Sequence, residues 1–249
     1  GTIVAGCAAA ATNNGYGIMG VGYNSKIRAY CVGSGCSGNP WPGIWQAYLD
    51  GCRVVNVSWS GIGSYPSLLA VQEMVRNGVV LVTGAGNSTT ATDHSAYANI
   101  PGVINVSSVN KDNNHGPTGH ARNQWVDLCA PGAAIASTYN PNLSGGNKYG
   151  AGWGTSFAAP YVSGTAALIL AVNPCLRPED VENIIKSSTS PIADGNQFPG
   201  LVGTGRLNSY QAVLLAQTYG NTVPTITSNT IWSTDRYVKG NVTIEAGAT

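Results

Sequence analysis

The segment from Gly154 to Pro160, which reads GTSFAAP, constrains the fold of this chain more than any other. Small residues on both sides of Ser156 would let another polypeptide backbone come close to the serine hydroxyl. After Ser156, small and apolar residues recur at helical spacing up to Asn173-Pro174, where proline ends a helix. The pattern therefore predicts a helix that begins at Ser156 and is buried on nearly all sides.

This placement gives Ser156 two interpretations. The unpaired amides and the positive dipole end of a helix N-terminus would stabilise an oxyanion formed on an attacked carbonyl, which suits a nucleophile. Serine and threonine are also common helix caps, and a cap needs no chemistry. The segment alone leaves both interpretations open.

A second segment, from Val79 to Ser88, favours the chemical interpretation. Its valine-rich run closed by Gly-Ala-Gly-Asn is typical of a buried parallel strand that ends in a tight turn. Active sites collect at such strand ends in open α/β sheets. Asn87 is therefore a candidate oxyanion donor, and the alternative is an ordinary turn asparagine in a left-handed conformation.

In this order and separation, the two segments resemble those of the subtilisin-like serine proteases. The likeness covers residues 1 to about 218. Further matching motifs are Gly1–Gly6, Val54–Ser60, Val126–Gly132 and Gly203–Asn208.

Apolar periodicity along the chain predicts an alternation of strands and helices, which is typical of a parallel sheet flanked by helices. The resemblance adds the fold class, an α/β three-layer sandwich with a mainly parallel central sheet. Strands are predicted over 26–32, 54–58, 79–83 and 103–109, and helices over 44–49, 67–76, 178–187 and 209–217, besides the helix at Ser156.

The resemblance implies a serine endopeptidase that acts on protein or peptide substrates. Ser156 would be the nucleophile, and Asn87 would hold the oxyanion together with the Ser156 amide. The walls of the primary substrate pocket would be Ser58, Trp59 and Ser60 on one side, and Gly84, Ala85 and Gly86 on the other. Ser60 replaces a glycine of the family, which would make the pocket narrower or more polar. A buried core position is the alternative for Trp59.

One departure from the family pattern concerns the other two members of the catalytic triad. The family's histidine immediately precedes the Gly-Thr that opens this chain, and its aspartate lies on a strand further upstream. We therefore expect the chain to be a fragment that is inactive alone. The chain's own His94, His115 and His120 lie in polar or loop-like segments, so we expect them to be solvated. A metal site at His115 and His120 is an alternative without supporting cysteine or carboxylate spacing.

Composition agrees with a secreted or cell-surface hydrolase. Only 9% of residues are charged and the net charge is +1, so nothing favours binding to nucleic acid. We expect no membrane span, because the longest apolar run is short. Cys31 and Cys36 bracket a loop suited to a local disulfide, whereas Cys7 is expected to be a buried free thiol. No cofactor is required for the chemistry. The family's calcium loop aligns with 12–17, but no ligand is assigned.

Residues 219–249 differ in composition from the rest of the chain. Threonine, serine, asparagine and valine dominate, and 223–231 and 237–244 alternate like β-strands. We expect a linker followed by the beginning of a downstream β-rich module. A second functional hypothesis for the whole chain is a non-catalytic binding or scaffold protein that keeps the fold. The presence of both Ser156 and Asn87 favours the protease.

Overall fold

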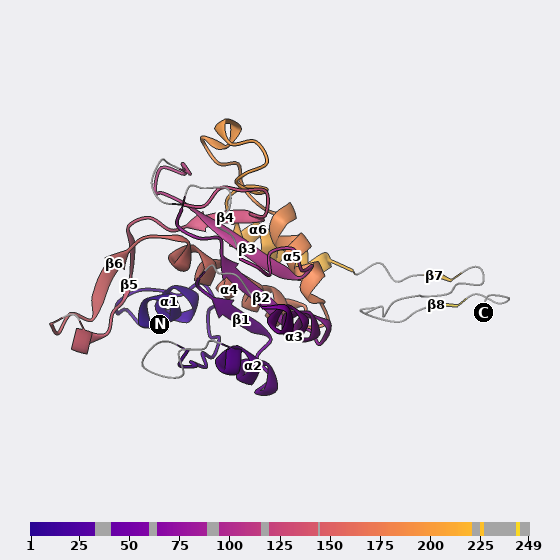
Figure 1. Cartoon of the computed structure of the whole chain (residues 1–249), viewed down its shortest axis with the longest axis horizontal. Coiled ribbons are helices and arrows are strands. Elements are labelled where there is room, and N and C mark those ends of the chain that lie inside the picture. Colours follow the sequence, from indigo (N-terminus) through magenta and orange to yellow (C-terminus); the bar gives the residue numbers. More distant parts are fainter. Residues whose placement is uncertain are drawn as a thin grey trace.

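The computed structural model describes residues 1–32, 41–59, 64–88, 95–115, 120–143, 145–220, 225–226 and 243–244. Its central feature is a parallel sheet with the strand order β1-β2-β3-β4 (Figure 1). The four strands are β1 (Val54–Val57), β2 (Val80–Gly84), β3 (Val103–Val109) and β4 (Leu128–Pro131). Both β2 and β3 are buried along their whole length, as expected for interior strands of a sheet that is covered on both faces.

Helices cover both faces of this sheet. On one face, Val80 and Val82 pack in a core with α4 (Thr155–Val172), α5 (Pro178–Ser187) and α6 (Ser209–Thr218). On the other face, Val79 and Leu81 pack with α2 (Trp41–Leu49) and α3 (Tyr65–Arg76). Successive side chains of a strand point to opposite faces, so residues 79–82 contribute side chains to both cores. The predicted three-layer α/β fold is confirmed.

The centre of the first core is α4. By length and composition this helix could cross a membrane, but 61% of it is buried inside the protein, as expected of a core helix. Helix α1 (Thr2–Ala9) packs against it at Gly164, where an added Cβ would lie 2.7 Å from the Ala8 carbonyl oxygen. The small residue at this position therefore permits the close packing of the two helices.

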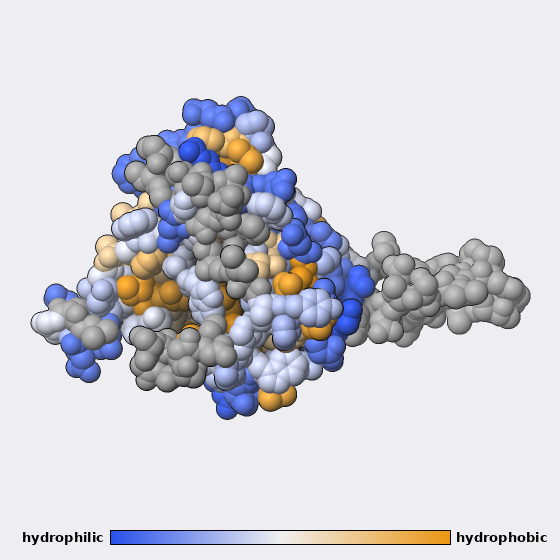
Figure 2. Space-filling view, viewed as in Figure 1, coloured by the Kyte–Doolittle hydropathy of each residue, from blue (hydrophilic) through white to orange (hydrophobic). Residues whose placement is uncertain are grey.

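Beside these layers, β5 (Ile135–Thr138) and β6 (Tyr149–Gly152) form an antiparallel pair next to α1 (Figure 1). Two short 3₁₀ turns are η1 (Pro141–Leu143) and η2 (Gly195–Gln197). On the face seen in Figure 2, hydrophilic residues dominate and apolar residues gather in separate patches.

The predicted elements over 54–58, 79–83, 103–109, 178–187 and 209–217 are confirmed to within one or two residues. The helices predicted over 44–49 and 67–76 begin earlier, at Trp41 and Tyr65. In the tail, β7 (Thr225–Ile226) and β8 (Thr243–Ile244) form a short parallel pair, and the rest of the predicted tail strands lies outside the described residues.

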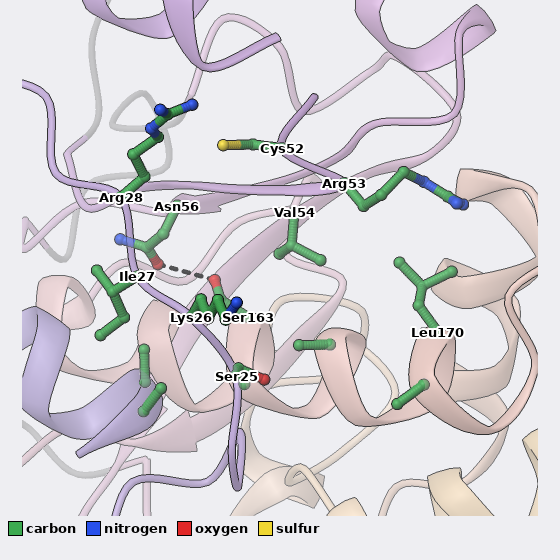
Figure 3. Close-up of a pocket in the computed structure, with 15 residues that line it drawn as sticks. Ser25, Lys26, Ile27, Arg28, Cys52, Arg53, Val54, Asn56, Ser163 and Leu170 are labelled. Carbon is green, nitrogen blue, oxygen red and sulfur yellow. Dashed lines mark hydrogen bonds between the residues drawn. The ribbon is translucent and has the colours of Figure 1, made fainter. Parts of the chain in front are cut away.

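The strand predicted over 26–32 is wrong. These residues form no ladder with β1, which is one of the two edge strands of the described sheet. A cavity of about 400 Å³ lies between the segment Ser25–Arg28, β1 and α4 (Figure 3). Apolar periodicity predicts the extended shape of such a segment, but a strand also needs a hydrogen-bonded neighbour.

Of the described cysteines, Cys31 is disulfide-bonded, whereas Cys36 lies outside the described residues. Cys7 is free and buried, as predicted. Burial raises the pKa of the Cys7 thiol above its usual value, so this thiol stays protonated and behaves as a small apolar group.

Candidate active site

Ser156 lies in the first turn of α4, as the sequence predicts, and its side chain is half-buried. The residue before the helix is Gly154, whose φ of 118° favours glycine. A Cβ on Gly154 would also lie 2.9 Å from Asn87 Oδ1, so a side chain would crowd the neighbouring loop. Both the backbone conformation and the lack of space for a Cβ require glycine at position 154. The glycine thereby allows the start of α4 to lie against Asn87.

Asn87 follows β2, at the carboxyl end of an interior strand. Its Oδ1 accepts hydrogen bonds from the Thr155 main-chain N–H at 2.8 Å and from Thr155 Oγ1 at 3.2 Å. Because Oδ1 is the acceptor of both bonds, the Asn87 amide is fixed in orientation. Its two Nδ2–H donors remain for a ligand, since no described residue accepts from them.

Thr155 is a residue whose role the sequence reasoning missed. Its hydroxyl accepts from the Gly86 main-chain N–H at 3.1 Å and donates to Asn87, so it connects the β2 turn to the start of α4. It is 2% exposed. The signal is a hydroxyl residue directly before the candidate serine, which the sequence pattern explains equally well as a small residue beside Ser156 or as part of a cap motif.

On the other side of Ser156 lies Ser58, just beyond β1. Ser156 Oγ donates to the Ser58 carbonyl oxygen at 2.8 Å, and Ser58 Oγ donates to the Ser156 carbonyl oxygen at 2.9 Å. The second bond follows from Pro160, which has no N–H to give to the carbonyl four residues earlier. Ser58 supplies the donor that the helix lacks there.

The remaining predicted pocket residues divide into two sides. Gly84, Ala85 and Gly86 are buried, and Gly84 lies so close to Thr155 that an added Cβ would be 3.1 Å from the threonine hydroxyl. Trp59 is 38% exposed, so the alternative of a buried core aromatic is wrong. Ser60 lies outside the described residues. The structure thus brings Ser156, Asn87 and Ser58 together, and the pocket roles stay predictions.

The expectation that the histidines are solvated is wrong for two of them. His115 and His120 are 1% and 2% exposed, because the chain around them folds back onto β3, where Ser107 and Ser108 offer hydrogen-bond partners. Neither ring receives the Ser156 hydroxyl hydrogen, which goes to Ser58. His94 lies outside the described residues.

Burial, with a smaller contribution from His115, lowers the pKa of His120 to about 4. The His120 ring is therefore neutral near pH 7. Within the described part of the chain, no three histidine, cysteine, aspartate or glutamate side chains gather in a way that could hold a metal ion.

Comparison with known proteins places this geometry in a family. The model of the subtilase family of peptidases matches residues 1–221. The chain belongs to the subtilase family. The resemblance found in the sequence is therefore confirmed, and the central α/β fold is that of the family's solved structures.

Three relatives illustrate the likeness of this subtilase chain. Fervidolysin from Fervidobacterium pennivorans is 33% identical over 82% of the chain. Its crystal structure is described as that of a keratinolytic enzyme related to subtilisin. That structure superposes with a TM-score of 0.72 over 85% of the chain and 35% of fervidolysin's solved chain. Subtilisin E from Bacillus subtilis is 36% identical over 84% of it. An extracellular protease from Xanthomonas campestris is 32% identical over 87% of it. The chain spans 33%, 54% and 40% of the lengths of these relatives, respectively.

Proposed function

We propose that the protein is a serine endopeptidase in which Ser156 attacks the carbonyl carbon of a peptide bond. The observation that carries this proposal is the position of Ser156 at the start of α4 beside an Asn87 amide whose Oδ1 is held by Thr155. Attack moves an electron pair onto the carbonyl oxygen. The Asn87 Nδ2–H and the Ser156 main-chain N–H are donors suited to that oxyanion.

The general base is proposed to come from outside residues 1–249, together with the carboxylate that orients it. Two observations favour this. The described histidines are buried beneath the Asn87 turn, and Ser156 Oγ donates to a main-chain carbonyl, which cannot take its proton. On this proposal, residues 1–249 alone do not hydrolyse peptides, because no described residue is placed to deprotonate the serine hydroxyl.

The cavity beside β1 supports the same proposal. The Val80 N–H donates to the Arg53 carbonyl, so in the parallel ladder Arg53 and Val55 direct their main-chain groups to β2. Alternation then turns the main-chain groups of Val54 and Asn56 away from β2, and both residues line the cavity. The unpaired edge of β1 beside this cavity can hydrogen-bond with one further strand. We propose that upstream polypeptide forms that strand and fills the cavity.

Substrate is proposed to bind as an extended peptide between the two sides of the pocket. Main-chain hydrogen bonds would provide affinity and the pocket would select one side chain. Trp59 is exposed on the Ser58 side, and the buried residues Gly84 to Gly86 are proposed as the opposite wall. Secretion is a further part of the proposal, supported by the extracellular protease among the relatives.

The test of the activity uses the product of the complete reading frame and a fluorophosphonate probe. We expect covalent labelling that disappears in Ser156→Ala, with turnover lower by about 10⁶, the loss known for the serine of a subtilisin. Ser209→Ala is the matched control, because Ser209 also begins a helix, and it should label normally. A folded product that does not label would mean that the protein is a binding scaffold.

The position of the upstream polypeptide is tested by amide hydrogen exchange on the same product. If a strand fills the cavity, the amides of Val54 and Asn56 exchange as slowly as that of Val55, which faces β2. If the cavity is empty, protection alternates along β1, with Val55 slow and its two neighbours fast. The second pattern would contradict the proposed seat even in an active enzyme.

A further inference from the structure

A buried polar cluster lies beneath the turn that carries Asn87. It consists of Ser107 and Ser108 on β3 and the rings of His115 and His120, whose centroids are 6.0 Å apart and nearly perpendicular. His120 Nδ1 contacts Ser108 Oγ, and His115 Nε2 lies 3.2 Å from Ser107 Oγ. All four residues are at most 2% exposed. The proposed reaction uses none of them, so their hydrogen bonds need another explanation.

Two of these residues meet at one carbonyl. Ser107 Oγ donates to the Ala121 carbonyl oxygen, and His115 Nε2 lies 3.3 Å from the same oxygen. A carbonyl only accepts hydrogen bonds, so the His115 contact requires a hydrogen on Nε2. The Ala121 carbonyl is thus held by an imidazole and a hydroxyl, both of them buried.

The other side of Ala121 reaches the candidate active site. The Ala121 N–H donates to the Gly86 carbonyl oxygen at 3.1 Å. The N–H of Gly86 donates in turn to Thr155 Oγ1, which donates to Asn87 Oδ1. Gly86 has a φ of 105°, a backbone conformation that residues with a Cβ rarely adopt. As a glycine it has more backbone freedom than any other residue would have at this position. Bonds to both its N–H and its carbonyl restrain that freedom directly before Asn87.

Charged groups lie around the cluster, and burial keeps the His120 ring neutral near pH 7. The Asp194 carboxylate accepts from the His115 main-chain N–H at 2.7 Å, and Arg122 stacks 4.6 Å from the centre of the Phe198 ring, which packs against His115. Cys129 is buried nearby and burial raises its thiol pKa to about 12, so it is also neutral.

We propose that His115, acting with Ser107 through Ala121 and Gly86, is a positioning residue that holds the Asn87 amide where an oxyanion forms. This inference rests on the proposed function, because it assigns the purpose of the cluster to the Asn87 donor. His115 touches no reacting atom. Its effect is to keep the Gly86 peptide from rotating, and with it the Nδ2–H donors of Asn87.

A double-mutant cycle on the complete gene product tests this inference. His115→Phe keeps a ring but removes Nε2–H, and we expect kcat to fall about tenfold with KM nearly unchanged. His115→Gln returns an N–H near the same place and should restore most of kcat. In an Asn87→Ala background, His115→Phe should have no further effect, because the donor that it positions is already gone.

The control and the readouts separate the alternatives. Thr165→Val removes another buried hydroxyl, one that bonds to Tyr161 and Ser209, and should lower the melting temperature without changing kcat. Equal losses from His115→Phe with and without Asn87 would overturn the inference, as would a changed residue preference with normal kcat. If the wild-type protein has no activity, the proposed function fails first. Amide exchange at Ala121 and Gly86 still tests the link, since His115→Phe should accelerate both.

Discussion

The two sides of Ser156 differ in how completely the fold supports them. Asn87 follows β2, an interior strand with a hydrogen-bonded neighbour on each side. Its Oδ1 accepts twice from Thr155, and the turn before it is tied to a buried polar cluster on β3. Ser58 follows β1, the edge strand, beside a cavity lined by Val54 and Asn56.

This difference indicates what each side can do. A group that stabilises a developing charge must already be in place when the charge forms, and interior strands supply that rigidity. On the edge side, the Ser58 hydroxyl donates to the Ser156 carbonyl oxygen and the Ser58 carbonyl accepts from Ser156 Oγ, so Ser58 holds the start of α4 in position. The following predictions test whether the Asn87 side governs turnover and the Ser58 side governs local stability.

The largest effect is expected from Asn87→Ala. Loss of the Nδ2–H donors should reduce kcat by about 10²–10³ with little change in KM, a magnitude taken from the corresponding asparagine of a subtilisin and not from this chain. Steady-state kinetics on a peptide substrate measures it. Asn77→Ala, which alters an exposed asparagine at the end of α3, is the control. A normal kcat in Asn87→Ala would contradict the proposal that the Asn87 amide stabilises the oxyanion.

A smaller effect is expected from acid acting on the cluster beneath Asn87. His120 takes up a proton near pH 6.5 when unfolded but near pH 4 when folded, because burial disfavours its charged form. Between these values the unfolded state binds more protons. The contribution of His120 to the free energy of unfolding is therefore fully present above pH 6.5. It is lost as the pH falls toward 4, which lowers the free energy of unfolding by at most about 3 kcal/mol.

Urea unfolding at several pH values measures this dependence. Stability should decline between pH 6.5 and 4 in the wild type and decline less in His120→Asn, which keeps a polar atom near Ser108 but does not titrate in that range. An identical decline in both proteins would assign the acid sensitivity to other groups. His115, whose ring packs against that of His120, is varied separately to exclude its contribution to the pH dependence.

Sequence patterns predicted the interior of the fold better than its edge. β3 has apolar residues at both ends and in the middle, and its boundaries at Val103 and Val109 were predicted without error. The segment 26–32 has comparable apolar character, but no described strand pairs with it, so the prediction failed. In this segment the burial that the pattern predicts is also missing, since Ile27 is 50% exposed. A periodic pattern does not record whether a neighbouring strand is present to pair with the segment and cover it.

The candidate site was predictable where a residue acts through its own chemistry. Ser156 and Asn87 stand in motifs of small residues that expose a hydroxyl and an amide. Thr155 and His115 act by holding other groups, and their partners are about seventy residues and six residues away in the sequence. The histidines flank glycine and proline, which indicated a solvated loop; burial by folding back onto β3 left no trace in the local sequence.

The smallest effect is expected from Ser58→Ala on the edge side. The Ser58 hydroxyl accepts from Asn56 Nδ2 at 2.8 Å and donates to the Ser156 carbonyl, which Pro160 leaves without a helical partner. Removing it should lower the free energy of unfolding by about 1 kcal/mol. Turnover should change far less than in Asn87→Ala, because Ser156 Oγ bonds to the Ser58 main chain, which the substitution retains.

Thermal unfolding and kcat are measured on the same preparation. A loss of kcat as large as that of Asn87→Ala would mean that the edge side also takes part in catalysis, and that the rigidity of interior strands is not what separates the two sides.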